Sequence, residues 1–318
     1  MLRTALLYLS HQQRIFDFVR HNTLAKGFAS RFVAGETIEE ALDAVKALNA
    51  KGITASLDLL GESVTDEKEA RSAGREYLHM LDRIHERKLD ANVSVKLTAM
   101  GQDISEDLCV AIMHDILGRA RDYRSFVRLD MESSAYTDRT LRLFEDRLYP
   151  NYPENVGIVL QSALRRTASD VEHANQLKCR VRICKGAYLE PESVAYPDKS
   201  DVDANYVKCM HMLMRDGNYP GIATHDEKII AEAKRFAKAE GISPDRYEFQ
   251  MLYGVRRDLQ EQLVREGYNM RVYVPFGTQW YPYLMRRLAE RPANVAFMTA
   301  NVVKEMVGGR GKSNGKHA

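Results

Sequence analysis

The sequence has little of what marks several common classes of protein. Lys and Arg total 46 and Asp and Glu total 44, so the formal net charge is only +2 over 318 residues. This balance gives no overall field that would attract a polyanion, and it argues against nucleic acid as a partner. No apolar run approaches the roughly 18 residues that span a bilayer, so we expect a chain that does not cross a membrane.

Cysteine is also scarce. The four cysteines, Cys109, Cys179, Cys184 and Cys209, show no CxxC spacing and no His partner at a metal-ligand interval. The spacing argues against a zinc site and against a disulfide framework, and we expect no metal. A reducing cytoplasm is the compartment that fits this pattern best.

Several catalytic and nucleotide-binding motifs are missing. A dinucleotide-binding fold would have GxGxxG after its first strand, where this chain reads Leu59–Ser63. The one dense glycine cluster, residues 308–311, lies in a polar tail. No nucleophile elbow, HExxH or Ser-His-Asp order is present, so hydrolysis by those routes is not indicated.

What the sequence does contain is a regular alternation of short apolar runs with longer helical stretches. Strands that alternate with helices indicate parallel pairing, and eight such units favour a closed barrel over an open sheet. We therefore predict an α/β fold, a (β/α)8 barrel. The eight runs are Ile53–Leu60, Ala91–Thr98, Phe126–Met131, Val156–Gln161, Val181–Ala187, Gly221–His225, Tyr247–Leu252 and Met270–Phe276.

The predicted organisation has three parts: an N-terminal helical extension at 1–51, the barrel at 52–306 and a tail without fixed structure at 307–318. Helix starts are indicated by a Ser or Thr with an acidic residue shortly after it. Four such signals are present: Thr37 before Glu40, Thr65 before Asp66 and Glu67, Thr167 before Asp170, and Ser200 before Asp203.

Polar residues follow or end seven of the predicted strands. In barrel enzymes the chemistry gathers at the carboxyl ends of the strands, so these residues are candidates for a shared site. Their cations outnumber their acids, which suits an anionic ligand or an anionic group of a larger cofactor. They are Lys96, Asp130, Glu132, Gln161, Arg182, Lys185, Thr224, His225, Gln250, Tyr253 and Tyr273.

A second pattern lies near the C-terminus. Tyr283, Arg286, Arg287 and Glu290 fall at i, i+3, i+4 and i+7, so a helix would place them on one face. Two adjacent guanidiniums offer a bidentate fork to a carboxylate or phosphate. The same spacing is also found on ordinary solvated helix faces, and spacing alone leaves both interpretations open.

Together these segments resemble the proline dehydrogenase family, flavin-dependent barrels that open proline catabolism. The resemblance spans essentially the whole predicted barrel, and the size resembles the short monofunctional bacterial form. It rests on Val95–Ala99, Leu129–Glu132, Val181–Tyr188, Ala223–His225, Tyr247–Leu252 and Tyr283–Asn294.

The resemblance implies an enzyme that oxidises L-proline to Δ1-pyrroline-5-carboxylate by hydride transfer to flavin N5 of FAD, with a membrane quinone as the electron acceptor. It implies that Lys96, Arg286 and Arg287 hold the proline carboxylate and that Tyr273 and Tyr283 pack around the ring, with Glu290 also in the substrate site. Asp130 and Arg182 would be the active-site pair beside the flavin. Met131, Gln161, Arg182, Lys185, Gly186, Ala187, Thr224 and His225 would contact FAD.

Two positions depart from the family pattern: Tyr253 stands where most members have histidine, and Leu189 where some have tryptophan. Both concern the periphery of the cofactor. Glu62, in the first strand-to-helix loop, is a candidate gate that pairs with Arg286 or Arg287. A weak peripheral contact of the cytoplasmic protein with the inner membrane stays open, through Arg310, Lys312 and Lys316.

The residues leave three other functions open. A Schiff-base lyase would use Lys96 or Lys185 as an amine nucleophile and hold no flavin. A non-catalytic barrel would bind an anion without turnover. Another flavin barrel, acting on folate, would share the architecture but not the paired arginines.

Overall fold

The computed structural model describes residues 29–61 and 63–290, and the side chains up to residue 287. The chain divides into two compact units. One is Ala34–Thr278; the described residues of the other are 29–33 and Gln279–Glu290. The predictions for residues 1–28, for Glu62 and for the tail at 307–318 lie outside the described residues, and the boundaries drawn at 51 and 306 stay predictions.

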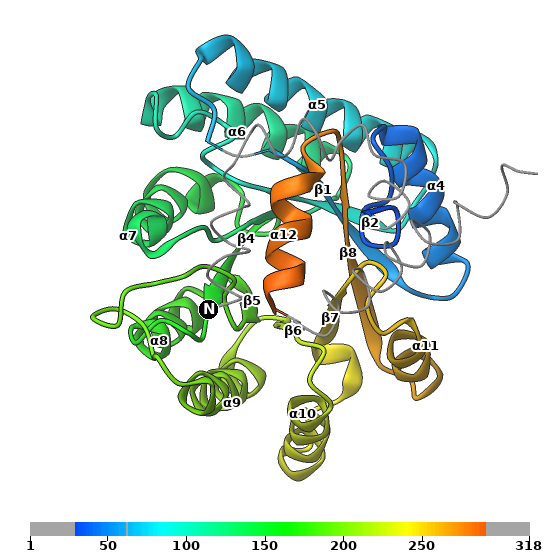
Figure 1. Cartoon of the computed structure of the whole chain (residues 1–318), viewed down its shortest axis with the longest axis vertical. Coiled ribbons are helices and arrows are strands. Elements are labelled where there is room, and N and C mark those ends of the chain that lie inside the picture. The colour runs from blue at the N-terminus through cyan, green and yellow to red at the C-terminus, as the bar shows by residue number, and fades with distance from the viewer. Residues whose placement is uncertain (1–28, 62, 291–318) are drawn as a thin grey trace, which may run out of the picture. The chain divides into compact units, whose positions relative to one another are not determined.

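Eight parallel strands form a closed barrel in the described part of the larger unit, which confirms the predicted fold (Figure 1). Each strand pairs with the next along the chain, and β1 closes the ring by pairing with β8, Thr54 opposite Arg271. Each of the eight predicted runs matches one strand, although β5 and β8 begin one residue before their runs. The strands are β1 Thr54–Leu59, β2 Ala91–Val95, β3 Val127–Leu129, β4 Val156–Gln161, β5 Arg180–Cys184, β6 Gly221–Ala223, β7 Glu248–Leu252 and β8 Asn269–Phe276.

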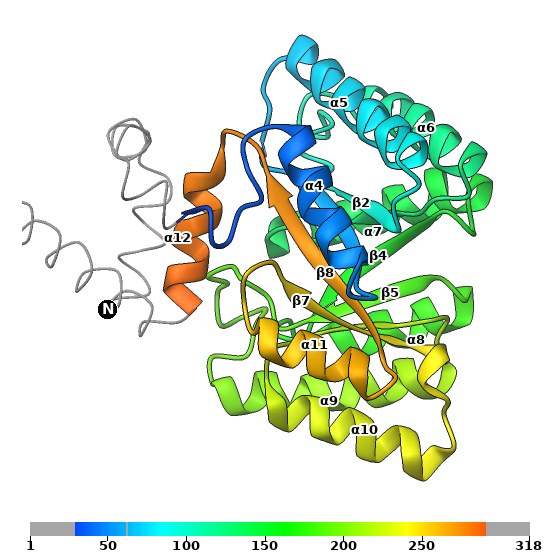
Figure 2. The same ribbon diagram turned by 90° about the vertical axis from the view of Figure 1, so that its right-hand side faces the viewer.

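Helices of the larger unit cover the outside of the barrel wall (Figures 1 and 2). Helix α4 precedes β1, and one helix follows each strand. The helices are α4 Ile38–Asn49, α5 Glu67–Glu86, α6 Glu106–Asp122, α7 Ser134–Leu143, α8 Thr167–Leu177, α9 Lys199–Asp216, α10 Glu227–Glu240, α11 Arg257–Arg265 and, in the smaller unit, α12 Trp280–Glu290; the short turns are η1 Phe144–Leu148, η2 Tyr149–Asn151 and η3 Pro244–Arg246. Among the described residues, no helix is both long and apolar enough to cross a bilayer.

A helix begins within two residues of each of the four predicted starts, and in the first two the signal also supplies the cap. Thr37 caps α4 in a reciprocal capping box, with Glu40 N donating to Thr37 Oγ1 over 3.4 Å and Thr37 N donating to Glu40 Oε2 over 3.0 Å. In the second signal Asp66 is the cap, because its carboxylate accepts from Lys68 N over 2.7 Å. Thr65 lies one residue earlier.

In the other two signals a helix begins within one residue of the predicted start, but the Ser or Thr does not cap it. Arg166 stands at the cap position of α8, and the hydroxyl of Thr167 donates instead to the carbonyl of Gln161 at the end of β4. Helix α9 begins after Asp198, so Ser200 is already helical. In the first case a buried strand-end carbonyl uses the hydroxyl that the pattern assigned to the helix terminus.

The two faces of the wall differ in chemistry. Apolar side chains such as Leu57, Val95 and Val272 are fully buried and belong to one core cluster with the surrounding helices. Arg182 on β5 reaches Ser94 on β2 over 3.1 Å, and since these strands are not neighbours, both side chains must point into the barrel. The interior is therefore lined by hydrogen-bonded polar groups, where many barrels carry branched apolar residues.

Candidate active site

Asp130 is the centre of the interior network at the carboxyl end of the barrel. It follows β3 directly, and its two carboxylate oxygens face different partners. Arg182 Nη1 donates to Oδ1 over 2.8 Å, and the hydroxyl of Tyr273 donates to Oδ2 over 2.6 Å. The ammonium of Lys96 lies 3.6 Å from Oδ2. Four residues predicted from separate strands thus meet at one point.

Lys96 makes its closest ion pair with a residue that the sequence reasoning missed. Its Nζ lies 2.7 Å from Oδ1 of Asp58 on β1, and the two residues are only 8% and 1% exposed. Burial alone would lower the pKa of Lys96, but the charges of Asp58 and Asp130 outweigh burial and hold this pKa well above its ordinary value. Lys96 is therefore a fixed cation at neutral pH.

Asp58 could have been found from the sequence. It is an acidic residue inside the otherwise apolar or small strand Thr54–Leu59, near its carboxyl end. The strand-end residues of the predicted site come from the other seven strands. Ser94 was missed for a different reason, since a serine inside a strand carries no distinctive signal.

The guanidinium of Arg182 is held on all sides. Its Nε donates to Gln250 Oε1 over 2.6 Å, Nη1 to Asp130 and Nη2 to Ser94. It also lies 5.3 Å from the ring centroid of Tyr273. Burial and the neighbouring carboxylate of Asp130 raise the pKa of Tyr273 well above its ordinary value, so the phenol stays a hydrogen-bond donor. The pair of Asp130 and Arg182 is rigid, with its charges in fixed positions.

The predicted cofactor residues gather at the ends of β4, β5 and β6. Gly186 has φ +104°, and a Cβ built there would meet Gln161 Oε1 at 2.8 Å, so another residue would be strained and would displace the Gln161 amide. The amide of Gln161 donates to the carbonyl of Glu132 over 2.7 Å. A glycine-lined close approach beside an ordered amide is the kind of surface that a planar ring or phosphate can approach.

Other predicted cofactor residues already have protein partners. Lys185 lies 2.6 Å from Asp203 and 3.1 Å from Asp226. His225 Nε2 accepts from Leu252 N over 3.0 Å, and Thr224 Oγ1 accepts from Asp226 N over 3.0 Å. These contacts order the strand ends. Met131 and Thr224 are buried, and Ala187 lies in the loop after β5.

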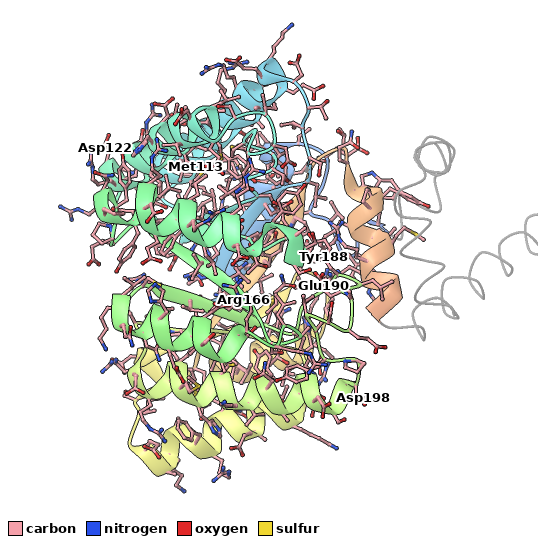
Figure 3. The ribbon with its side chains drawn as sticks, turned by 90° about the vertical axis from the view of Figure 1, so that its left-hand side faces the viewer. Met113, Asp122, Arg166, Tyr188, Glu190 and Asp198 are labelled. Atoms are coloured by element: carbon pink, nitrogen blue, oxygen red, sulfur yellow. The ribbon has the colours of Figure 1, made fainter. Side chains whose placement is uncertain are left out.

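That loop connects β5 to α9 and carries Tyr188 and Glu190 (Figure 3). The carboxylate of Glu190 accepts from the backbone N of Ser134 over 2.8 Å and also from the Ser134 hydroxyl. Ser134 begins α7, where a carboxylate complements the exposed N–H groups of the helix terminus. Glu190 therefore fastens the loop that holds the predicted cofactor residues.

Helix α12 of the smaller unit forms as predicted. The guanidinium of Arg287 lies 5.3 Å from the ring centroid of Tyr283, which places these two residues on one helix face. Arg286 lies three residues after Tyr283, so the helical spacing places it near the same face. Glu290 is the last residue of the helix, and its side chain, like Glu62, lies outside the described part of the structure.

Comparison with known proteins gives one consistent result. Residues 41–300 match the family model described as proline dehydrogenase. Proline dehydrogenase of Deinococcus radiodurans is 42% identical over 96% of this chain and 98% of its own length, and proline dehydrogenase 1 of Bacillus subtilis strain 168 is 41% identical over 96% and 100%. Proline utilization A from Bdellovibrio bacteriovorus, solved after inactivation by N-propargylglycine, matches with a TM-score of 0.78 and 28% identity over 83% of this chain and 32% of that one.

Proposed function

The chain belongs to the proline dehydrogenase family and is an oxidoreductase, and from this membership we propose that it oxidises L-proline to Δ1-pyrroline-5-carboxylate with bound FAD. The observation that supports this most directly is the meeting of Lys96, Asp130, Arg182 and Tyr273 at the carboxyl end of the barrel. The two relatives that are 41–42% identical to this chain are named proline dehydrogenase. The match covers 98% and 100% of their lengths.

The proposed roles follow from family membership and, for the barrel residues, also from charge and position. Lys96 is a buried cation that Asp58 holds in place, and with Arg286 and Arg287 it would bind the proline carboxylate. Tyr273 and Tyr283 would flank the ring, with Glu290 in the same site and Glu62 as its gate. Asp130 and the triply held Arg182 would keep a positive charge in a fixed place, so that no reorganisation is needed during the reaction.

The residues around β4, β5 and β6 suit FAD. The close backbone approach at Gly186 and the donors of Gln161 and Lys185 would hold it, together with Met131, Ala187, Thr224 and His225. When bound, FAD would supply the hydride acceptor for the carbon beside the proline nitrogen. The protein itself contributes binding and orientation, which explains why the sequence shows no dedicated nucleophile.

The Schiff-base alternative fits these contacts less well. An amine attacks a carbonyl only when it is unprotonated, and the neighbouring carboxylates raise the pKa of Lys96. Lys185 already makes ion pairs with Asp203 and Asp226, so its amine is not free to meet a carbonyl. A binding-only barrel or a folate-specific flavin barrel has no observation in its favour here.

The decisive experiment is the visible spectrum of the purified protein before and after addition of L-proline without oxygen. We expect a bound flavin spectrum that proline bleaches. Flavin that stays oxidised would contradict proline as the substrate, and a colourless protein that does not take up FAD would contradict the cofactor. In that last case, borohydride trapping of a substrate on Lys96 or Lys185 would support the lyase.

We propose a membrane quinone as the electron acceptor of a cytoplasmic protein. Re-oxidation of the proline-reduced protein should then be fast with a soluble quinone analogue and slow with oxygen. A weak contact with the inner membrane is part of the same proposal. Co-sedimentation with anionic vesicles, which should disappear at high salt, tests it independently of turnover.

A further inference from the structure

A cavity of about 180 Å³ lies at the amino ends of the strands, the opposite end of the barrel from Asp130. It is lined by residues at or just before the starts of several strands. Asn92 belongs to β2, Arg180 is the first residue of β5, and Glu248 is the first residue of β7. Every lining residue belongs to the larger unit. The proposed reaction uses none of these residues.

Positive charge dominates this cavity. Arg124, Arg128, Arg180 and Arg271 line it, against the two carboxylates of Asp90 and Glu248. Glu248 is committed to Arg271, whose Nε donates to it over 2.8 Å. In the described part of the chain the other three arginines make no ion pair with a carboxylate. The cavity therefore has three guanidiniums outside ion pairs but only one further carboxylate, that of the exposed Asp90.

Two of these guanidiniums are fixed in place. Arg128 Nη1 donates to the carbonyls of Ile158 and Arg180, over 3.1 and 2.6 Å. Arg128 and Arg180 also both contact the ring of Phe126, with guanidinium carbons 4.8 and 5.2 Å from its centroid. A guanidinium held in this way loses little freedom when it binds a ligand.

Within residues 29–61 and 63–290, three buried polar atoms of the residues that line the cavity have no hydrogen-bond partner. They are Nε of Arg128, Oγ of Ser125 and Oδ1 of Asn92. Arg128 is only 4% exposed, so its charge is buried without a directly paired carboxylate. Burial, aided by the charge of Arg182, lowers the pKa of Arg128 to about 9. Such an arrangement is costly unless a counter-charge completes it.

We propose that this cavity is a second anion site, which binds a small oxyanion of the phosphate class through Arg180, Arg128 and Ser125. The Nε–H of Arg128 and the hydroxyl of Ser125 supply unused donors, and Arg180 and Arg124 supply charge at the rim. Inorganic phosphate suits these groups because guanidiniums bind it through charge-assisted, directional hydrogen bonds. The site is separate from the substrate site and does not depend on the identity of the substrate.

The test is a phosphate titration of the flavin-loaded protein at constant ionic strength, followed by isothermal calorimetry and by thermal unfolding. Sodium chloride replaces phosphate in the reference series. The variant is Arg180→Gln, which removes a half-buried charge without touching the Arg128 side chain. The matched control is Arg215→Gln, because Arg215 also lies over an aromatic ring, that of Phe236, but does not line the cavity.

We expect phosphate to bind and to raise the unfolding temperature of the wild type and of Arg215→Gln. Affinity should fall about tenfold or more in Arg180→Gln, the loss expected for one charge-assisted contact. Equal responses to phosphate and chloride would mean that water fills the cavity and would overturn the proposal. A phosphate response that persists unchanged in Arg180→Gln would place the anion elsewhere, including in the substrate site, and would overturn it as well.

Discussion

At the scale of single residues, the pair of Lys96 and Asp58 determines how the candidate site is charged. Asp58 keeps Lys96 protonated, and Lys96 neutralises a carboxylate that is almost fully buried. Removing one member of such a pair leaves the other uncompensated, which is more damaging than the loss of the attraction itself.

We therefore predict that Lys96→Met lowers the free energy of unfolding by about 3 to 5 kcal/mol and abolishes measurable turnover. Urea denaturation and proline-dependent flavin reduction measure the two effects. The control is Lys51→Met, which breaks the exposed 2.6 Å pair with Glu261 and should change stability little, because water screens the pair. Equal stability losses in the two variants would show that the buried pair of Lys96 and Asp58 contributes no more to stability than an exposed ion pair.

Arg182 is a case in which side-chain shape matters as much as charge. Three of its nitrogen atoms donate to three different residues, and a lysine cannot reproduce that arrangement. Arg182→Lys should lower kcat by about 10- to 100-fold while KM changes little, since the proposed role is in the reaction step. Ser94→Ala removes only the 3.1 Å bond and should have an effect of about 1 kcal/mol at most. A mere rise in KM for Arg182→Lys would assign Arg182 to substrate binding.

At the scale of elements, the prediction of the strands succeeded because two signals agree. Short apolar runs alternate with helical stretches, and polar residues stand at the ends of the same runs. All eight runs match strands, and Lys96, Asp130, Arg182 and Tyr273 meet as the barrel closes. Prediction of helix starts was less secure. A hydroxyl near a helix terminus can serve a neighbouring carbonyl, as Thr167 does, and local sequence does not contain that competition.

The turn after β5 gives a prediction at this scale. Gly186→Ala should weaken FAD retention, because its φ of +104° is unfavourable for alanine and the new Cβ would push against Gln161. The measurement is the flavin-to-protein ratio after dialysis. Gly241→Ala is the matched control, since Gly241 ends α10 at φ +66° with no atom within 4 Å of the added Cβ. It should cost about 1 to 2 kcal/mol of stability with full flavin content. Equal flavin loss in both variants would point to general destabilisation.

Helix α12 gives a second prediction for an element. If Arg287 binds the substrate carboxylate, Arg287→Met should lower kcat/KM. The loss should correspond to about 2 to 4 kcal/mol of transition-state stabilisation. Steady-state kinetics with L-proline would measure this. Arg265→Met, an exposed arginine in the last turn of α11, should leave kcat/KM unchanged. Wild-type kinetics in Arg287→Met would show that Arg287 does not bind the substrate and that the arginine pair of α12 belongs to an ordinary solvated helix face.

At the scale of the whole molecule, hydrogen bonds run through the barrel from the candidate active site to the cavity at the other end. Asp130 accepts from Arg182, Arg182 donates to Gln250, and Gln250 donates to Glu248 over 2.5 Å. The sequence alone could not reveal this connection, because the alternation of inward and outward side chains gives no information on which strands face each other across the interior.

Glu248 is the member of this network that lines the cavity, and its titration should be visible in the stability of the whole protein. Burial would raise the pKa of Glu248, but Arg271 and Gln250 outweigh burial and hold the pKa below its ordinary value near 4.5. The unfolded chain then binds more protons than the folded chain between the two pKa values. The contribution of Glu248 is therefore present above about pH 4.5 and is lost as the pH falls through the folded-state pKa.

Glu248→Gln should accordingly be less stable than the wild type by about 3 to 5 kcal/mol at pH 7, because Arg271 loses its buried partner. The difference should shrink as the pH falls below about 4.5, where the carboxylate of the unfolded wild type takes up its proton, and on through the lower folded-state pKa. Urea denaturation of both proteins between pH 7 and pH 3.5 measures this difference in stability. The control is Glu266→Gln, which removes the exposed ion pair of Glu266 with Lys234. A difference that stays constant over this range would mean that Glu248 acts through packing, and that the network through the barrel does not depend on its charge.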